Sequence, residues 1–340
     1  MRVLLSAPCV YPLGGSGYGG MERLCVLVAA GLRARGHEVT VVGGNGSDGE
    51  GVYAGSASGD YLESEEVAWR EYSWLLGKSE VVLDFSHSHF WRTEQGRVPG
   101  LSLIWHDPRM MRPRMPTSNV CALSAWQARR FTEETGQGCG VLDVICGDEA
   151  VYYHDGSAVR GERWLAIGVM QPQKGNLEAA RLARKLGVGL DIIGPHGDAR
   201  YEQAVLLECS PPQVVYHGEV SHPDKMRLLR ECVGLIYPVS YPPGMGEAHS
   251  HKLVEALMCG TQGVILDQGA MKEVFQGHAW LASDGEEMGR LMGMVATKDE
   301  ERRSNRAYDT ARRSKEVWGV GAAALRVEKA LERVISGERW

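Results

Sequence analysis

Short runs of apolar residues alternate with longer amphipathic stretches along the whole chain. Each short run has the length and the Val, Ile and Leu content of a buried β-strand. In the first half, these runs predict strands at residues 3–6, 39–43, 81–84, 101–105, 120–124 and 141–145. In the second half, they predict strands at residues 164–168, 190–193, 214–217, 234–237 and 264–266. The stretches between the strands include helical patterns at residues 22–35, 125–134, 177–186, 223–231 and 252–259.

Strands that are apolar throughout and separated by helices are typical of parallel sheets covered on both faces. The polar stretch at residues 152–162 separates the two series, and we interpret it as a linker. The sequence therefore predicts an α/β protein with two Rossmann-like, doubly wound domains. The tail at residues 315–335 has the pattern of one long amphipathic helix. In such folds ligands bind beyond the carboxyl ends of the strands, so the loops there are the first place to look for a site.

Length and composition are consistent with this picture. The chain has 340 residues, enough for about two domains. The net charge is −6, which argues against a generally basic nucleic-acid binder but leaves a local patch open. The longest apolar run, residues 24–32, is too short to span a membrane, and the N-terminus has the pattern of a strand rather than of a signal peptide. Eight scattered cysteines without a CxxC pair indicate reduced thiols in a cytoplasmic protein.

A glycine-rich segment, GGSGYGGMER at residues 14–23, follows the first strand and opens a helix. Gly15, Gly17 and Gly20 match the GxGxxG pattern, and backbone N–H groups in such a loop can hold an anion. A dinucleotide site is disfavoured, because about eight residues separate the strand from the pattern and the second predicted strand ends without the acid that would bind a ribose. A flexible turn is the alternative interpretation.

Polar residues follow two of the predicted strands. His106 and Asp107 come directly after the strand at 101–105, where an imidazole can position a hydroxyl or stabilise developing charge. Lys174 lies in GVMQPQKG, after the strand at 164–168 and just before a helix, where an ammonium group suits a diphosphate. The alternatives are a loop cap for the first pair and an exposed surface lysine for the second.

The segment EAHSHKLVEALMCGT at residues 247–261 holds two glutamates, Glu247 and Glu255, eight residues apart. Ser250 is a candidate N-cap of the helix that follows, whose N-terminus favours phosphate. Glu255 lies within an otherwise apolar pattern, where a carboxylate needs hydroxyl or N–H donors such as those of a ribose. His-Ser-His occurs at residues 87–89 and 249–251, but neither copy has the additional ligands of a zinc site, so we expect no metal.

The order of these motifs resembles that of the retaining GT-B glycosyltransferases of family 4. The matching strings are GYGGMERL, GHEVTVV, DFSHSHFW, LSLIWHD, ALSAWQARRF, GVMQPQKG, GLDIIGP, VVYHGEVSHPDKMRLLREC and GEAHSHKLVEALMCGT followed by GVILD, and they cover most of the chain. The short length and the GYGG opening are most similar to compact bacterial members that tailor natural products. The resemblance implies an acceptor domain at residues 1–155, a nucleotide-sugar domain at 156–317, and a last helix at 318–340 that crosses back.

The resemblance also implies roles for individual residues. His106 is expected near the reacting sugar, Lys174 on the diphosphate, Glu247 at the donor sugar hydroxyls and Glu255 on the nucleotide ribose. The further residues expected at the donor are Gly19, Gly20, Gly168, Glu219, Ser250, His251 and Lys252. Those expected at the acceptor are Tyr18, Asp107 and Arg109. The co-substrate is expected to be a UDP- or GDP-linked sugar, with no separate cofactor and no metal.

The chain departs from the family pattern in two places that bear on the site. Val169 stands where the family usually has an arginine, so one diphosphate cation is missing, and Arg23, Lys252 and the 109–114 loop are candidates to replace it. Ala248-His249-Ser250-His251 stands where Pro-Phe-Gly-Leu is usual, which suggests an unusual donor sugar.

Three interpretations of function are therefore open. The first is a retaining, metal-independent glycosyltransferase. The second is a non-catalytic member that binds nucleotide sugars, for which Val169 is the main argument. The third is an NAD-dependent oxidoreductase, based on the GxGxxG match. The basic, methionine-rich loop at residues 105–116 fits an anionic or lipid-linked acceptor, nucleic acid, or simply a loop that orders when the acceptor binds.

Overall fold

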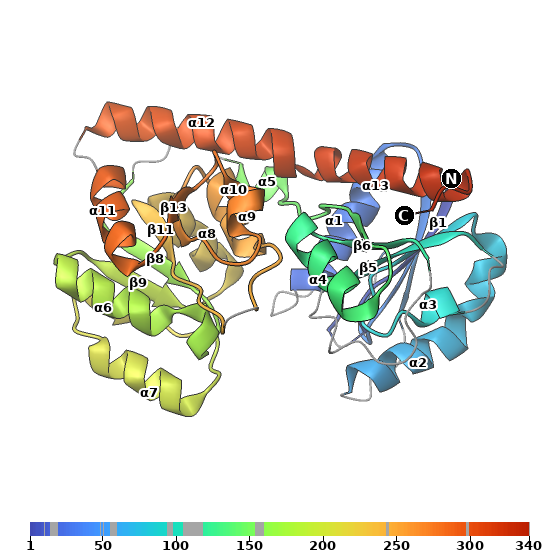
Figure 1. The fold of residues 1–340 in the computed structure, drawn as a ribbon, viewed down its shortest axis with the longest axis horizontal. Coiled ribbons are helices and arrows are strands. Elements are labelled where there is room, and N and C mark those ends of the chain that lie inside the picture. The colour runs from blue at the N-terminus through green and yellow to red at the C-terminus, as the bar shows by residue number, and fades with distance from the viewer. Residues whose placement is uncertain are drawn as a thin grey trace. The chain divides into compact units, whose positions relative to one another are not determined.

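The chain folds into two compact units, drawn as a ribbon in Figure 1. The computed structural model describes residues 1–9, 11–13, 20–47, 49, 51–54, 60–93, 98–104, 118–153, 160–242, 245–296 and 299–339. The first unit comprises Met1–Cys146 and Trp318–Trp340, and the second comprises Gly147–Val317. Each unit is built on a parallel sheet, as the alternation of apolar and amphipathic stretches predicted.

The sheet of the first unit has seven strands in the order β3-β2-β1-β4-β5-β6-β7, and all neighbouring strands are parallel. Every residue of its central strands β4 and β5 is buried, which explains why these strands are apolar throughout. The strand bounds are β1 (Arg2–Ser6), β2 (Glu38–Gly43), β3 (Val52–Ala54), β4 (Val81–Asp84), β5 (Gly100–Ile104), β6 (Val120–Ala122) and β7 (Gly140–Val141).

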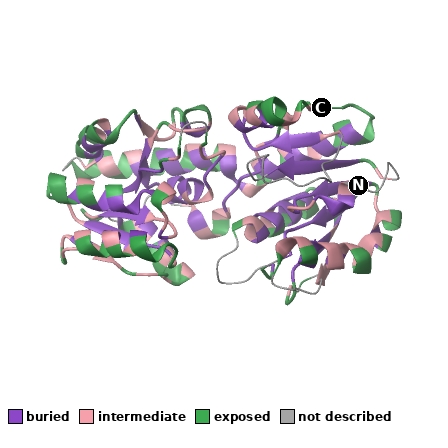
Figure 2. Cartoon of the chain, turned by 60° about the horizontal axis from the view of Figure 1, so that its bottom comes forward, coloured by how far each residue is buried: buried purple, intermediate pink, exposed green. Residues whose placement is uncertain are grey.

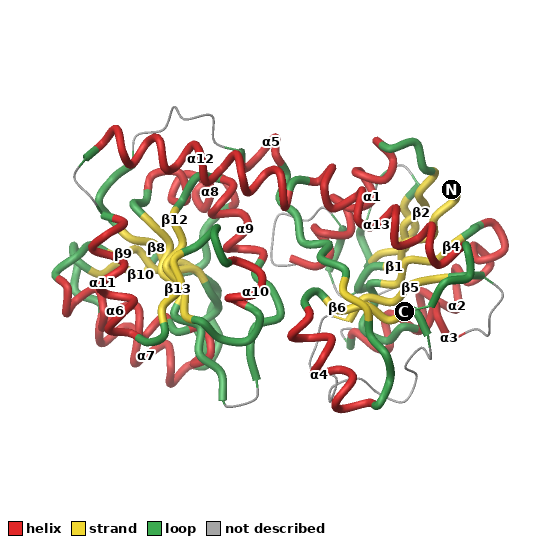
Figure 3. Tube along the Cα trace, turned by 45° about the horizontal axis from the view of Figure 1, so that its top comes forward, coloured by secondary structure: helices red, strands yellow, loops and turns green. Residues whose placement is uncertain are grey.

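The helices of the first unit include the last helix of the chain, which packs against the first (Figure 3). A β-carbon on Gly31 of α1 would lie 2.7 Å from the Ala324 side chain of α13, so glycine allows the close approach. Glu328 of α13 also pairs with His37 at 2.7 Å and with Arg35. The helix bounds are α1 (Gly20–Ala34), α2 (Tyr61–Tyr72), η1 (Ser73–Lys78), α3 (Phe90–Thr93), α4 (Ala125–Thr135) and α13 (Val320–Ile335).

The sheet of the second unit has six strands in the order β10-β9-β8-β11-β12-β13, again parallel throughout. The strand bounds are β8 (Trp164–Ile167), β9 (Leu190–Ile193), β10 (Val214–Tyr216), β11 (Gly234–Tyr237), β12 (Gln262–Leu266) and β13 (Trp280–Ala282). The helix bounds are α5 (Glu149–Tyr152), η3 (Pro172–Lys174), α6 (Asn176–Leu186), α7 (Ala199–Glu208), α8 (His222–Glu231), α9 (His251–Met258), α10 (Met271–Phe275), α11 (Gly285–Val295) and α12 (Glu300–Trp318). In both units the central strands are buried and the outer helix faces are exposed (Figure 2).

The predicted α/β class with two Rossmann-like sheets is confirmed, and the differences are local. The pattern missed the edge strands β3 and β13, which have three residues each and are only partly buried, so they carry little apolar signal. The prediction of one tail helix over 315–335 was wrong. Gly319 has extended backbone with φ −67° and ψ 154°, and this residue separates α12 from α13.

Two further findings concern the helices and the cysteines. Within the part of the chain that the structure describes, no helix is both long enough and apolar enough to cross a membrane. All eight cysteines are free thiols, and six of them are buried.

Candidate functional site

The candidate site lies at the carboxyl end of the second sheet, where the loops after β8 and β11 meet. The loop after β8 contains the single turn η3, which Gly175 ends in the left-handed region at φ +72°. A β-carbon on Gly175 would lie 2.2 Å from the backbone oxygen of Pro238 in the loop after β11. Only glycine lets the two loops pack this closely. The contact places Lys174 beside the residues that follow β11.

Three side chains converge on one carboxylate oxygen of Glu247. Lys174 Nζ lies 2.6 Å from Glu247 Oε1, and the hydroxyl groups of Tyr241 and Tyr237 donate to the same oxygen at 3.0 and 3.1 Å. Lys174 also donates to the Tyr241 hydroxyl oxygen at 3.3 Å. The Lys174 and Glu247 side chains are 21% and 16% exposed, so the pair is sheltered but reachable from solvent. A small ligand can therefore contact both charges.

The two charged groups stabilise each other's ionised form. Burial by itself lowers the pKa of Lys174, but the neighbouring Glu247 carboxylate and Tyr241 hydroxyl outweigh it, and the net pKa is above the usual value. Burial by itself raises the pKa of Glu247, but Lys174 and Lys252 outweigh it, and the net pKa is below the usual value. The site therefore holds an ammonium group and a carboxylate that both keep their charge near neutral pH.

Lys252, in the first turn of α9, is the second ammonium group of the site. Its Nζ donates to the backbone oxygen of Ile167, the last residue of β8, at 2.7 Å, and lies 4.4 Å from the centre of the Tyr237 ring. Burial and the nearby Lys174 ammonium lower the pKa of Lys252 to about 7, although Glu247 acts in the opposite direction. The Glu247 carboxylate is thus the negative charge that acts on both lysines, although only Lys174 bonds to it.

Helix α9 begins directly after its predicted cap. The Ser250 Oγ accepts from the backbone N–H of Leu253 at 3.3 Å, and the Ser250 N–H donates to His249 Nδ1 at 2.8 Å. His249 packs edge-on against the Phe275 ring, with 5.2 Å between the ring centres. Since the helix starts at His251, Glu247 lies in the preceding loop, and the two glutamates do not share a helix face.

Glu255 has a separate set of partners. Tyr152 donates its hydroxyl to Glu255 Oε1 at 2.6 Å, and Lys225 of α8 lies 2.7 Å from Glu255 Oε2. The Lys225 ammonium also lies 5.7 Å from the centre of the Tyr152 ring. Glu255 is 8% exposed, so its charge is balanced by Lys225 within a nearly closed environment. The structure therefore gives the two glutamates different surroundings.

The remaining predicted site residues lie on several loops and helix starts. Gly20 is the exposed first residue of α1, and a β-carbon there would meet nothing within 4 Å. Gly168 directly follows β8 and lies against Lys174 and Lys252. Glu219 is exposed in the loop after β10, and His251 is the partly buried first residue of α9. The predicted residues Tyr18, Gly19, His106, Asp107 and Arg109 lie outside the described residues.

The sequence analysis missed four side chains that hold the two glutamates. Tyr237 follows the rule that ligands gather where parallel strands end, because it is the last residue of β11, but the apolar pattern alone predicts it only as part of a buried strand. Tyr152 was interpreted as part of the linker, and Lys225 as a surface residue of an amphipathic helix. The strand-end rule alone was enough to find Tyr237, whereas Tyr241, Tyr152 and Lys225 needed the tertiary structure.

The histidines of the first His-Ser-His segment lie in different surroundings. His89 is buried in the first unit, and His87 packs edge-on against the Tyr61 ring with 5.0 Å between the ring centres. Among the residues described here, no group of three or more His, Cys, Asp or Glu side chains is arranged to hold a metal ion.

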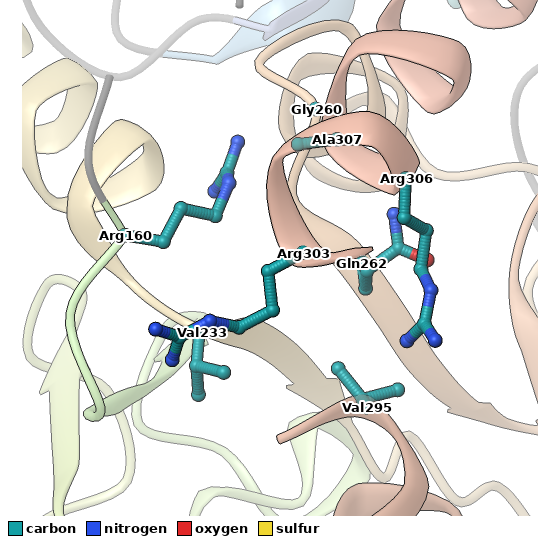
Figure 4. Close-up of a pocket in the computed structure, with 8 residues that line it drawn as sticks. All are labelled: Arg160, Val233, Gly260, Gln262, Val295, Arg303, Arg306 and Ala307. Carbon is teal, nitrogen blue, oxygen red and sulfur yellow. The ribbon is translucent and has the colours of Figure 1, made fainter. Parts of the chain in front are cut away.

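A second feature of this unit is a small cavity lined by three arginines, Arg160, Arg303 and Arg306 (Figure 4). Its volume is about 10 Å³, room for about one water molecule. Figure 4 shows that the three arginine side chains point in different directions. Arg306 lies 5.5 Å from the centre of the Trp280 ring. The arginines do not converge on a common point, so the cavity is not a site for a phosphate-sized ligand.

Arg160 instead connects several backbone segments. Its guanidinium donates to the backbone oxygens of Leu229 and Cys232 at 3.2 and 3.1 Å, to the Thr261 hydroxyl at 2.9 Å, and to the backbone oxygen of Cys259. The residue is only 8% exposed. Arg160 therefore provides hydrogen-bond donors for backbone carbonyl groups that are buried and no longer bond to water.

We expect Arg160→Met to lower the free energy of unfolding by about 3 kcal/mol, because an unsatisfied buried acceptor costs about 1–3 kcal/mol. Urea titration followed by circular dichroism measures the loss. Arg227→Met is the matched control, because the Arg227 side chain is 55% exposed and its removal is expected to change stability by at most about 0.5 kcal/mol. Equal stability of the two variants contradicts a structural role for Arg160.

Comparison with known proteins identifies the fold of the chain through solved structures. No protein-family profile matches the chain, and no curated protein matches it in sequence. Solved structures match over its full length. AviGT4, described as a glycosyltransferase involved in avilamycin A biosynthesis, is 20% identical with a TM-score of 0.77, and the match covers 100% of this chain and 99% of that one.

Two further matches are of similar extent. HepE of Anabaena, solved with UDP and glucose, is 14% identical with a TM-score of 0.69 over 98% of this chain and 99% of that one. Sucrose-phosphate synthase from Thermosynechococcus elongatus is 12% identical with a TM-score of 0.72 over 99% and 100%. The chain thus has the GT-B fold that the motif order indicated.

Proposed function

We propose that this protein is a retaining glycosyltransferase that moves a sugar from a nucleoside diphosphate to an acceptor hydroxyl without a metal ion. The observation that carries the proposal is the paired Lys174 and Glu247 at 2.6 Å, at the carboxyl end of a parallel sheet in a GT-B fold. An ammonium group there suits a diphosphate, and a carboxylate suits sugar hydroxyl groups. Structural neighbours that include glycosyltransferases and a UDP complex support the same function.

The proposed reaction breaks the bond between the anomeric carbon and the donor phosphate oxygen. The acceptor oxygen forms its bond to that carbon on the same face, and the departing diphosphate takes the acceptor's proton. Lys174 and the N-terminus of α9 stabilise the negative charge that grows on the leaving group. Glu247 holds the sugar hydroxyls, and Glu255, with Lys225 beside it, binds the ribose. No protein carboxylate is assigned as a nucleophile.

The remaining expected residues, of which Gly20 lies in the described part and the others do not, complete the proposal through the family resemblance. His106 lies near the reacting sugar, and Gly19 and Gly20 line the loop at the donor phosphates. Tyr18, Asp107 and Arg109 bind the acceptor. We assign the acceptor to the first unit and the UDP- or GDP-linked sugar to the second, and place the reaction in the cytoplasm, where eight free thiols are stable.

Binding of nucleotides tests this function. We expect UDP, GDP or their sugar conjugates at millimolar concentration to raise the thermal unfolding temperature, because a ligand at about 100 times its Kd adds about 2.7 kcal/mol of stability. ADP and NAD serve as comparison ligands, and a shift with NAD alone favours the oxidoreductase. If the folded protein shows no shift with any nucleotide, the proposed function is wrong.

A non-catalytic nucleotide-sugar binder is the second candidate, and Val169 is the observation that favours it. Hydrolysis of the donor in the absence of acceptor distinguishes an enzyme from a binder. An enzyme is expected to transfer the sugar slowly to water, whereas a non-catalytic binder leaves the donor intact. Donor binding without any hydrolysis or transfer favours the binder.

A further inference from the structure

The donor site contains more positive charge than its own carboxylate can balance. Lys174 and Lys252 both act electrostatically on Glu247, but Glu247 bonds to Lys174 and to two tyrosine hydroxyl groups. The Lys252 ammonium has three N–H donors, and a single hydrogen bond, to the backbone oxygen of Ile167, is found for it among the described residues. Two of its donors are therefore available to a ligand.

The position of Lys252 is costly in the free protein. It is the second residue of α9, where the helix dipole is positive and a cation is disfavoured by about 0.3–1 kcal/mol. Burial adds to this cost, and Lys174 adds a like charge nearby. An anion at the N-terminus of α9 removes all three penalties at once. The arrangement is that of a cation placed for a negatively charged ligand.

Lys252 also lies against the loop where the family arginine is absent. A β-carbon on Gly168 would be 3.3 Å from Lys252 Nζ, and the next residue in that loop is Val169. The ammonium group of Lys252 thus lies at the end of β8, one residue before Val169, whose own side chain lies next to Gly197.

We propose that Lys252 supplies the second cation of the donor diphosphate site, and that it takes up a proton when the donor binds. The inference rests on the proposed function, and it adds a pH dependence to donor binding. Three titratable groups act on Lys252 or lie against it: Lys174 of η3, Tyr237 at the end of β11, and Glu247 in the segment between β11 and α9. Tyr241 bonds to two of these groups, Lys174 and Glu247.

The direction of the pH dependence follows from the charges. In the free protein the pKa of Lys252 is about 7, so the side chain is mostly neutral at pH 8. A bound diphosphate favours the ammonium form and raises this pKa. Donor affinity is therefore highest below pH 7 and falls as the pH rises above it, by up to about tenfold per pH unit.

Isothermal titration calorimetry with UDP-glucose or GDP-mannose, whichever stabilises the wild-type protein, tests the inference. Neither conjugate titrates near neutral pH, so any proton uptake comes from the protein. At pH 8, in buffers of different ionisation enthalpy, we expect the wild type to take up a large fraction of one proton per donor bound. Lys252→Met should abolish this uptake and weaken binding at pH 6.5 by about tenfold or more.

Two further variants test whether the effect is specific to Lys252 or follows from the loss of any positive charge. Lys185→Met removes an exposed lysine of α6 and should behave as the wild type. The double variant V169R/K252M should regain donor affinity without proton uptake, because arginine keeps its charge at every pH used.

The outcomes distinguish this inference from the function on which it rests. Donor binding by the wild type without proton uptake at pH 8, or uptake that persists in Lys252→Met, overturns the role of Lys252 and leaves the glycosyltransferase proposal standing. No binding of any nucleotide sugar overturns both.

Discussion

Substituting Lys174 by methionine is expected to lower the rate of sugar transfer by about 100- to 1,000-fold, the range found when one donor to a developing negative charge is removed. The ammonium group lies 2.6 Å from Glu247 and belongs to a loop that Gly175 fixes against the backbone of Pro238. Methionine keeps most of the side-chain volume but cannot donate to a leaving diphosphate. Steady-state kinetics with saturating acceptor measure the loss in kcat.

The Lys174 variant needs a control for folding. Without the Lys174 ammonium group, Glu247 keeps its two tyrosine partners but loses one of the two lysine charges that lower its pKa, so its carboxyl group is expected to titrate at higher pH. Lys185→Met serves again as the surface control, with unchanged kcat expected. A Lys174→Met protein that unfolds at the wild-type temperature and turns over within twofold of wild type contradicts the assigned role.

The fold was predictable where strands are long and fully buried. The bounds of β4, β9 and β11 agree with the apolar runs residue by residue, because every residue of these strands is in the core. The break at Gly319 was not predictable from periodicity, since the amphipathic pattern continues on both sides of it. An isolated glycine within a helical pattern is tolerated at a cost of about 1 kcal/mol, so its presence alone does not predict the end of a helix.

The site was predictable as a set of residues but not as a set of contacts. Lys174 and Glu247 were selected because each follows a strand or precedes a helix in a recognised motif, yet they are 73 residues apart and nothing in either motif predicts that they bond to each other. The hydroxyl group of Tyr241 was missed for the same reason. The sequence resemblance implied different roles for Glu247 and Glu255, and the start of α9 after Ser250 gives them separate surroundings.

Replacing Glu247 by glutamine is expected to lower sugar transfer by about 100-fold or more and to remove the contribution of the sugar to donor affinity. Glutamine has the same shape, but a neutral amide oxygen is a weaker acceptor for sugar hydroxyls than a carboxylate. It also cannot balance the charge of Lys174. The informative readout is the ratio of the Kd of the nucleoside diphosphate to the Kd of its sugar conjugate. This ratio cancels any change in phosphate binding that both ligands share.

In the wild type we expect the sugar conjugate to bind more tightly than the nucleoside diphosphate, and in Glu247→Gln we expect the two affinities to converge. Tyr241→Phe is the matched control, because it removes one of the hydroxyl donors to Glu247 and leaves the carboxylate in place. A hydrogen bond to a charged group is worth about 1.5–3 kcal/mol, but the carboxylate itself remains in this variant, so transfer should fall less than in Glu247→Gln. If Glu247→Gln keeps the preference for the sugar conjugate, the carboxylate does not contact the sugar. Its bond to Lys174 then serves only to position that ammonium group for the diphosphate.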